Sequence, residues 1–332
     1  MPLTWESCRH NPDVDWLIFT DQERTPEMPG NVELIPITLR DFTVDLFKRL
    51  RFEGEVPPLP AYKLCDFKGT WGEAFQDRLV DYPFWGACDL DIVWGQIRAF
   101  HPEDVLSRFD ILTSFRSCIS GACTIFRNTP AVNHLFRTIP DVGQMLREDH
   151  NYSTEEMLFN DAALRAEKAG ALRVLRRRLC VSETWADWNE WAERLVLEEE
   201  GTLSNFPRLL GASYWEQGRI FHSATRTEMA YHHFMLGKKL YPRRAWSYPF
   251  RSDCMTGMEM TPRRIRMRFK PGCFTARVRH YFLTRFGRFP LDLVQNPIPN
   301  AISYLKEFLK RFFPGWVALY KRHKAADSGP TC

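Results

Sequence analysis

The sequence lacks the features that place a chain in or across a membrane. No stretch approaches the roughly 20 apolar residues that a transmembrane helix needs. The first residues, MPLTWE, show no charged segment followed by an apolar one, so no signal peptide is predicted. The 9 cysteines are odd in number and form no Cys-x-x-Cys pair, which argues against a zinc ribbon or a disulfide framework. These absences predict a cytoplasmic protein.

The composition is otherwise that of an ordinary globular protein. The 332 residues suffice for one large domain or two smaller ones, and a hydrophobic content of 44% allows a full core. Internal repeats and low-complexity tracts are absent.

Charge is unevenly distributed along the chain. Residues 241–332 contain 18 Lys/Arg against 5 Asp/Glu, whereas residues 1–240 contain 27 basic and 36 acidic residues. Within the basic part, residues 302–324 interleave aromatic and cationic side chains, which predicts an amphipathic helix that lies on an anionic membrane surface. The alternative is a C-terminal helix that packs on the domain. Nucleic-acid binding is the weaker interpretation of the same charge, and we expect none.

Strand and helix patterns alternate over the first half of the chain. Strands are predicted at residues 15–21, 31–35, 110–115 and 121–128. Helices are predicted at residues 38–50, 61–79 with a break near Gly69 or Gly72, 130–136, and 154–169 with Ser153 as the cap. This alternation predicts an α/β fold with a mixed or mostly parallel sheet.

Two aspartates mark the most informative segment. The run FWGACDLDIVWG at residues 84–95 predicts a buried strand of a parallel sheet, and Asp89 and Asp91 lie where it ends. Side chains two apart on a strand point the same way, so both carboxylates can reach one cation. Open α/β sheets bind ligands at the carboxyl ends of their strands. The pair therefore predicts Mg²⁺ or Mn²⁺ with a phosphorylated ligand, although many such pairs are solvated loop residues.

Three other polar groups have ordinary structural explanations. Lys63 and Asp66 lie three apart near a helix start, where a surface salt bridge is the favoured interpretation. A histidine such as His233 can bind a metal, but a lone His pair is more often structural. Glu155 and Glu156 begin a helix, where acidic residues usually complement the helix dipole.

Together these segments resemble a bacterial family of uncharacterised, glycosyltransferase-like proteins found among polysaccharide-biosynthesis genes. The resemblance rests on YKLCDFK at residues 62–68, followed by FWGACDLDIVWG at residues 84–95. The segments at residues 11–21 and 121–128 fit the same pattern, so the resemblance covers roughly residues 5 to 240. That family is similar to the GT-A class of nucleotide-sugar transferases.

The resemblance implies a fold and a domain boundary. Residues 1–240 would form a GT-A-like domain, with a mixed, mostly parallel sheet flanked by helices, and residues 241–332 a basic helical extension. Relatives begin with an additional strand ahead of the segment that matches Trp5, and this chain starts without it. Because that strand helps to form the nucleotide pocket of a GT-A fold, we expect either a misassigned start or a poor donor site.

The resemblance also assigns the donor site. Asp89 and Asp91 would bind the metal, Mn²⁺ or Mg²⁺, and the diphosphate of the nucleotide-sugar donor. Lys63 and Asp66 would lie near the nucleotide and the donor sugar.

Two later segments complete the assignment. His233-Phe234-x-x-x-Lys238 is similar to the His-Phe-x-Gly-x-x-Lys turn of glycogenin-like transferases, in which the His binds metal and the Lys binds diphosphate. Here the Gly lies one position later. Glu155 or Glu156 lies where many GT-A enzymes keep an acidic residue near the acceptor.

The leading hypothesis is therefore a metal-dependent glycosyltransferase that moves a sugar to a glycan or glycolipid acceptor in polysaccharide biosynthesis. An inverting reaction needs a carboxylate base, for which Glu155 and Glu156 are the candidates, and a retaining reaction needs none. The sequence does not choose between them.

Two hypotheses from other classes stay open. A phosphohydrolase of the haloacid dehalogenase type would use Asp89-x-Asp91-x-Val93, with Thr113 or Ser114 as its second motif. That motif normally opens the domain, however, and 88 residues precede it here. The other hypothesis is a non-catalytic, membrane-docked module of a glycan assembly complex.

Overall fold

The computed structural model describes residues 2–26, 28–116, 118–177, 179–182, 213–222, 226–233, 255–261 and 264–269. The chain divides into two compact units, residues 1–276 and 277–332, and every described residue belongs to the first. The domain boundary predicted at residue 240 therefore falls inside a unit rather than between two.

Most helices of the described ranges are short. They comprise α1 (Pro2–Arg9), α2 (Leu39–Arg49), α3 (Trp71–Ala74), α4 (Gln76–Leu79), α5 (Ile97–Phe100), α6 (Glu103–Leu106), α7 (Pro130–Asn133), α8 (Val142–Met145) and α9 (Phe159–Lys168). Two 3₁₀ helices, η1 (Ala61–Thr70) and η2 (Leu135–Thr138), and a π-helical turn, η3 (Thr154–Leu158), complete the set. The break predicted near Gly69 or Gly72 is confirmed, because η1 ends at Thr70 and α3 begins at Trp71. The segment expected as one helix at residues 154–169 is divided into η3 and α9.

The described strands form four sheets. They are β1 (Trp16–Thr20), β2 (Val32–Pro36), β3 (Phe84–Cys88), β4 (Ile92–Trp94), β5 (Ile111–Thr113), β6 (Cys123–Arg127), β7 (Val174–Arg176), β8 (Cys180–Ser182), β9 (Ser213–Glu216), β10 (Arg219–His222), β11 (Glu228–Met229), β12 (Tyr231–His233), β13 (Met255–Thr261) and β14 (Arg264–Phe269). Their orders are β1-β2, β3-β6-β5-β7, β4-β12-β8 and β11-β10-β9-β13-β14.

The structure is mixed α/β, as expected, but its sheets are not mostly parallel. Among the described pairs only β1 with β2, β5 with β7, and β12 with β8 are parallel. β3 pairs antiparallel with β6, and β6 pairs antiparallel with β5. The predicted parallel sheet around the aspartates is therefore wrong. A hydrophobic run shows that a strand is buried but does not show the direction of its neighbours.

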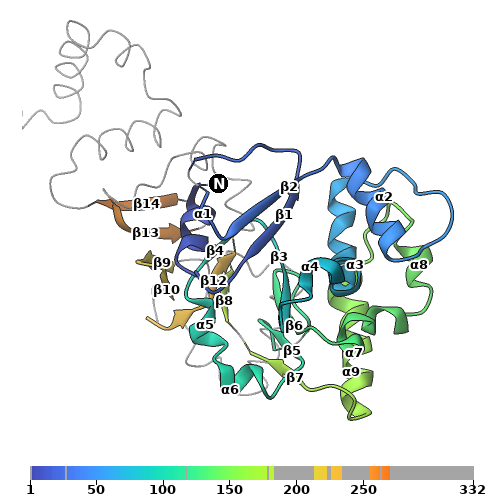
Figure 1. Ribbon diagram of the computed structural model, residues 1–332. Coiled ribbons are helices and arrows are strands. Elements are labelled where there is room, and N and C mark those ends of the chain that lie inside the picture. Colours follow the sequence, from blue (N-terminus) through green and yellow to red (C-terminus); the bar gives the residue numbers. More distant parts are fainter. Residues whose placement is uncertain are drawn as a thin grey trace, which may run out of the picture. The chain divides into compact units, whose positions relative to one another are not determined.

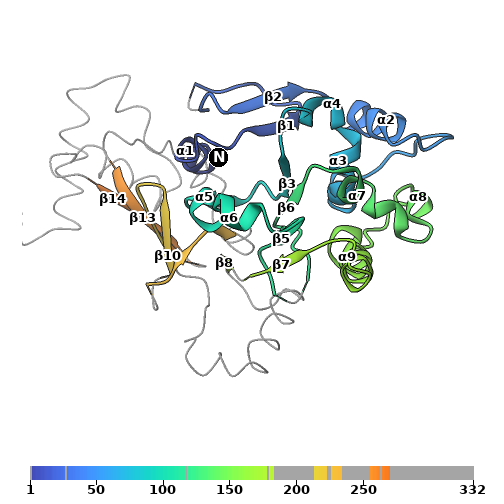
Figure 2. The same ribbon diagram turned by 60° about the horizontal axis from the view of Figure 1, so that its bottom comes forward.

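A hydrophobic core lies on each face of the β3-β6-β5-β7 sheet. On one face Trp85 and Phe126 pack with Phe159 of α9 and with the apolar side of α2. Cys88 and Ile125, from the same two strands, contribute to a second core with β4, β12 and α1. Side chains alternate between faces along a strand, so β3 and β6 supply both cores. In Figure 1, α7 and α9 lie on one side of this sheet and β4, β12 and β8 on the other, and Figure 2 shows the same arrangement for α7, α9 and β8.

The aspartate segment joins these two layers. The run at residues 84–95 is not one strand, because it leaves the first sheet after Cys88 and enters the second at Ile92. Asp89, Leu90 and Asp91 form the link between them. The carboxylates thus follow the carboxyl end of a strand, as predicted, but they lie at a junction of two sheets.

Several local expectations can be compared with the structure. The strands predicted at residues 15–21, 31–35, 110–115 and 121–128 are confirmed as β1, β2, β5 and β6, and α2 confirms the helix at 38–50. The predicted cap is wrong: Ser153 has a φ of 51° and its side chain makes no capping hydrogen bond. His233, with which the turn implied by the resemblance begins, is the last residue of strand β12, and residues 234–238 lie outside the described residues. The amphipathic helix at residues 302–324 lies outside the described residues.

Candidate metal and ligand site

Backbone pairing positions the two aspartates. The last residue of β3 pairs with the first of β6, and the amide of Asp89 then donates a hydrogen bond to the carbonyl of Ala122 at 3.0 Å. Two residues later Asp91 precedes β4, whose residues are buried. The side chain of Asp89 is 29% exposed and that of Asp91 is 17% exposed. Both carboxylates therefore lie near the surface, where an ion or a ligand can reach them.

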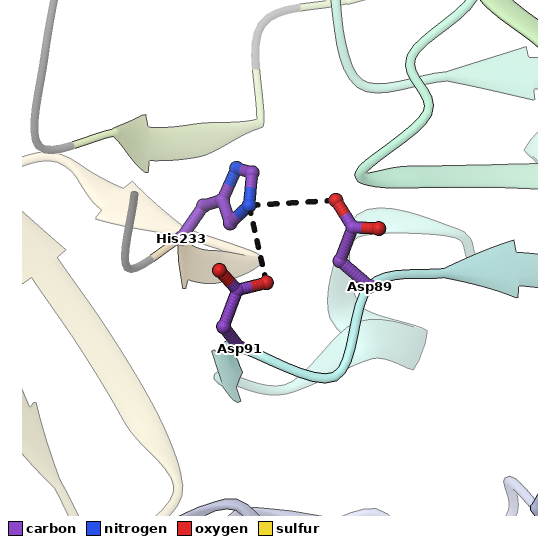
Figure 3. A group of neighbouring side chains, drawn as sticks. All are labelled: Asp89, Asp91 and His233. Carbon is purple, nitrogen blue, oxygen red and sulfur yellow. Dashed lines mark ion pairs between the residues drawn. The ribbon is translucent and has the colours of Figure 1, made fainter. Parts of the chain in front are cut away.

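Antiparallel pairing of β12 with β4 brings His233 to the same place. In this register His233 lies opposite Ile92, so the end of β12 meets the start of β4 beside Asp91. Its Nε2 lies 3.4 Å from Oδ2 of Asp89 and 3.4 Å from Oδ1 of Asp91 (Figure 3). The predicted association of His233 with the aspartates is therefore present in the structure.

The three side chains are arranged as a possible cation site. One donor atom from each of Asp89, Asp91 and His233 lies within 4.8 Å of the others. Separations of 3.4 Å suit neighbouring ligands of one ion with bonds of about 2.2 Å. Carboxylates suit Mg²⁺ and Mn²⁺, whereas imidazole is a ligand of transition ions. The mixed set fits Mn²⁺ better than Mg²⁺.

The neighbouring thiol does not belong to this set. Burial, followed by the charge of Asp89, raises the pKa of Cys88 to about 12. A thiol must lose its proton to bind a metal, so Cys88 stays a neutral core residue at physiological pH.

Lys68 contacts the site from η1, and sequence reasoning did not select it. Its buried Nζ donates hydrogen bonds to Oδ1 of Asp89 at 2.5 Å and to the carbonyl of Gly121 at 2.6 Å. Burial opposes its charge, but Asp89, Cys65 and Glu155 overcome that effect and raise the pKa of Lys68. Lys68 therefore stays protonated and holds one oxygen of Asp89, while the other oxygen faces His233.

The 3₁₀ geometry of η1 explains this placement. A 3₁₀ helix has three residues per turn, so side chains three apart lie above one another. Tyr62, Cys65 and Lys68 consequently share one face, which runs from an exposed tyrosine to the buried lysine at Asp89. The sequence pattern predicted an α-helix here, and α-helical spacing would spread these residues around the axis. The three-residue spacing of Tyr62, Cys65 and Lys68 was the sequence signal that could have indicated their shared face.

Lys63 and Asp66 occupy another face of η1 and are fully buried. Nζ of Lys63 donates to Oδ2 of Asp66 at 2.7 Å and to the carbonyls of Met145 and His150. The ion pair expected on the surface is therefore formed in the interior.

Asp66 also fixes the start of η3. Its two carboxylate oxygens accept hydrogen bonds from the amides of Tyr152 at 3.0 Å and Thr154 at 2.9 Å. Because these contacts occupy Lys63 and Asp66 within the protein, we correct the expectation that they face a nucleotide and assign them to the packing of η1 against residues 145–154.

The two glutamates of η3 differ in their surroundings. Oε1 of Glu156 accepts a hydrogen bond from the amide of Gly121 at 3.0 Å. Oε2 of Glu155 is buried without a hydrogen-bond partner. Burial and the nearby charge of Glu156 raise the pKa of Glu155 to about 8, although Lys68 acts in the opposite direction. Glu155 is thus a carboxyl group that can hold or release a proton near neutral pH.

Lys238, predicted to bind diphosphate, lies outside the described residues. The structure therefore brings together Asp89, Asp91 and His233, adds Lys68, and places Glu155 close enough to Lys68 to act on its charge.

A family comparison gives the chain its classification. Residues 1–267 match the model of the Family of unknown function (DUF6625). The chain belongs to this family. All the described strands before β14 fall within the matched residues, so the DUF6625 region includes the candidate site and the β9–β13 pairing. No curated protein and no solved structure matches the chain.

No helix within the described ranges combines the length and the apolar character needed to cross a membrane.

Proposed function

We propose that this protein is a metal-dependent glycosyltransferase with a GT-A-like fold. It would transfer a sugar from a nucleotide-sugar donor to a glycan or glycolipid acceptor in polysaccharide biosynthesis. The observation that carries the proposal is the convergence of Asp89, Asp91 and His233 from two strand ends that lie far apart in sequence. Two carboxylates held close together repel each other, and a divalent cation would relieve that repulsion.

The residues of the site have distinct roles in this proposal. Asp89, Asp91 and His233 would hold Mn²⁺, which when bound neutralises charge on a leaving diphosphate. Lys68 orients Asp89 by holding its Oδ1, so that Oδ2 is directed toward His233. Because Asp89 is already restrained, it loses less conformational entropy when the metal binds.

Glu155 is the better of the two candidate bases. In an inverting transfer, the acceptor oxygen bonds to the anomeric carbon, the bond to the diphosphate breaks, and a carboxylate takes the acceptor proton. Glu156 already accepts a backbone hydrogen bond, whereas Oε2 of Glu155 has no partner. A pKa of about 8 also suits proton transfer near neutral pH. A retaining reaction would not require this role.

The phosphohydrolase hypothesis gains no comparable support. It assigned Thr113 or Ser114 to a second catalytic motif. The hydroxyl of Thr113 is buried, donates to the carbonyl of Cys118 and accepts from the amide of Ser120. The hydroxyl of Ser114 donates to the carbonyl of Cys123 and contacts the hydroxyl of Tyr231. Both groups are engaged in the interior, so the transferase remains our proposal.

Metal and nucleotide binding test the proposal directly. Mn²⁺ should bind the wild-type chain in isothermal titration calorimetry, and a nucleoside diphosphate with Mn²⁺ should raise the melting temperature, because ligands that bind the native state stabilise it. Asp91→Asn and His233→Ala should each weaken Mn²⁺ binding by at least about tenfold. Asp81→Asn, which changes an exposed aspartate, is the matched control and should bind like wild type.

Two results would count against the proposal. One is equal Mn²⁺ affinity in wild type and Asp91→Asn. The other is the absence of a thermal shift with any nucleoside diphosphate.

A further inference from the structure

An exposed aromatic side chain lies on the η1 face that leads to the metal ligands. Tyr62 is 72% exposed, whereas Lys68, two turns further along the same face, is 6% exposed and bonded to Asp89. Leu90, between the two aspartates, and Met157, in η3, are also exposed large hydrophobic residues. Three segments that meet around Lys68 and Asp89 thus each present an apolar side chain to solvent.

Tyr62 and Glu155 belong to the same neighbourhood. The hydrogen bonds from Tyr152 and Thr154 to Asp66 hold the start of η3 against η1, and Glu155 is the next residue. Partial burial, and then the charges of Cys65, Glu155, Glu156 and Asp89, raise the pKa of Tyr62. The tyrosine ring therefore lies within electrostatic range of the carboxylates at the site.

Residues 151–160, which include η3 and the residues on either side of it, contain several buried polar atoms without hydrogen-bond partners. Within residues 151–160 these are Nδ2 of Asn151, Oγ1 of Thr154, Oε2 of Glu155 and Oδ1 of Asn160. Ser153, the residue before η3, has a left-handed φ of 51°, and η3 itself is a π-helical turn. Unpaired buried polar atoms and strained backbone both cost free energy and concentrate where a ligand is bound.

We propose that Tyr62 and Glu155 form a subsite for the acceptor sugar, with the apolar face of a pyranose ring on Tyr62 and a ring hydroxyl donating to Oε2 of Glu155. This assignment rests on the proposed function, which supplies the neighbouring donor site. The unpaired atoms of residues 151–160 include acceptors, a donor and a hydroxyl. A ligand with many hydroxyl groups matches such a mixture because each hydroxyl both donates and accepts.

Saturation-transfer NMR tests the subsite without metal or nucleotide. The full chain is mixed, in EDTA, with methyl glycosides of glucose, galactose, mannose, N-acetylglucosamine and rhamnose. At least one should receive saturation from the wild-type protein. Tyr62→Ala should weaken its binding about five- to tenfold, and Tyr62→Phe should keep it, because the ring rather than the hydroxyl makes the contact. At a pH of about 9, above the raised pKa of Glu155, Glu155→Gln should weaken binding through loss of a charged acceptor.

Tyr82→Ala is the matched control. Tyr82 is also an exposed tyrosine, but its hydroxyl bonds Asp15, and its removal should leave glycoside binding unchanged. Because Tyr62 is exposed, Tyr62→Ala should melt at the wild-type temperature, which separates lost binding from lost folding.

The subsite is overturned if no glycoside binds, or if Tyr62→Ala binds as wild type does. Loss of uridine monophosphate binding in Tyr62→Ala, with glycoside binding intact, would also overturn it, since Tyr62 would then stack a base. Glycoside binding that depends on Tyr62, without any Mn²⁺ or nucleotide binding, would instead show that the proposed function fails while the subsite stands.

Discussion

At the scale of single residues, the described part of the site sets the charge of Lys68 against those of several carboxylates. Lys68 is buried, and its hydrogen bonds to Asp89 and to the carbonyl of Gly121 favour its charged form. Glu155 has no such partner at Oε2, so burial favours its neutral form. The two carboxyl groups near this lysine therefore differ in their surroundings: Lys68 holds the carboxylate of Asp89, whereas burial raises the pKa of Glu155.

The raised pKa of Glu155 predicts how its replacement changes stability with pH. The folded-state pKa of about 8 lies above the ordinary value of 4.5, so ionising Glu155 destabilises the folded state as pH rises between these values. Glu155→Gln removes this penalty. In EDTA, its melting temperature should exceed that of wild type by an amount that grows from pH 5 to pH 8, by roughly 2–4 °C for each kcal/mol relieved.

Thermal unfolding at several pH values measures this difference. A gap between the two melting temperatures that stays constant or narrows with rising pH would show that Glu155 is ionised throughout. Glu53→Gln, at an exposed glutamate, provides the control and should follow the wild-type profile.

At the scale of secondary-structure elements, one ion pair connects η1 to the segment before η3. Lys63 donates hydrogen bonds to the carbonyls of Met145 and His150. Asp66 accepts hydrogen bonds from the backbone amides of Tyr152 and Thr154. Lys63→Met leaves Asp66 buried without its cation, a change that typically costs about 3–5 kcal/mol. Urea unfolding should show this loss of stability.

Lys48→Met is the control for that experiment. Lys48 lies on the exposed side of α2, so the free energy of unfolding should change by less than about 0.5 kcal/mol. A similarly small effect for Lys63→Met would mean that the buried pair contributes little to the packing of η1.

The close approach of Gly95, which follows β4, to the residues just before β12 predicts a second element-scale effect. A Cβ atom at Gly95 would lie 2.7 Å from the carbonyl oxygen of Met229 and 3.1 Å from that of Ala230. Gly95→Ala should therefore push the two strands apart and move His233 away from Asp91. We expect a loss of stability of about 1–3 kcal/mol and at least a severalfold loss of Mn²⁺ affinity, measured by calorimetry.

Gly30 offers a matched control, because no atom lies within 4 Å of a Cβ built there. Gly30→Ala should retain both stability and metal affinity. Retained Mn²⁺ affinity in Gly95→Ala would show that His233 is not held in place by this strand contact.

At the scale of the whole molecule, strands from beyond residue 240 complete the first unit. β13 pairs antiparallel with β9 on one side and with β14 on the other. Met258 and Met260 of β13 and Trp215 of β9 are all fully buried. A chain cut at residue 240 would leave β9 without this partner and Trp215 without its cover.

Truncation tests this conclusion. A chain of residues 1–276 should melt within about 3 °C of the full chain, because it retains β13 and β14. A chain of residues 1–240 should lose at least about 5 °C or fail to fold, since a deleted strand exposes a sheet edge and part of the core. Equal melting temperatures for the two truncated chains would place the true boundary at residue 240.

The sequence by itself determined the local features of this protein. Hydrophobic spacing located α2 and the strands β1, β2, β5 and β6, and the placement of acidic residues after a buried run singled out Asp89 and Asp91. These features depend on residues close together in the chain, so their periodicity and chemistry are readable directly.

Only the tertiary structure decided which residues act together. Strand direction, the 3₁₀ pitch of η1 and the β4–β12 register brought Lys68 and His233 to the aspartates, and buried Lys63 and Asp66 instead. Strand direction, helix pitch and strand register each depend on packing between segments far apart in the chain. The free-energy differences between alternative packings cannot be read from a local sequence pattern. Residue type shows what a side chain can do, whereas its long-range neighbours determine whether it faces a ligand or the core.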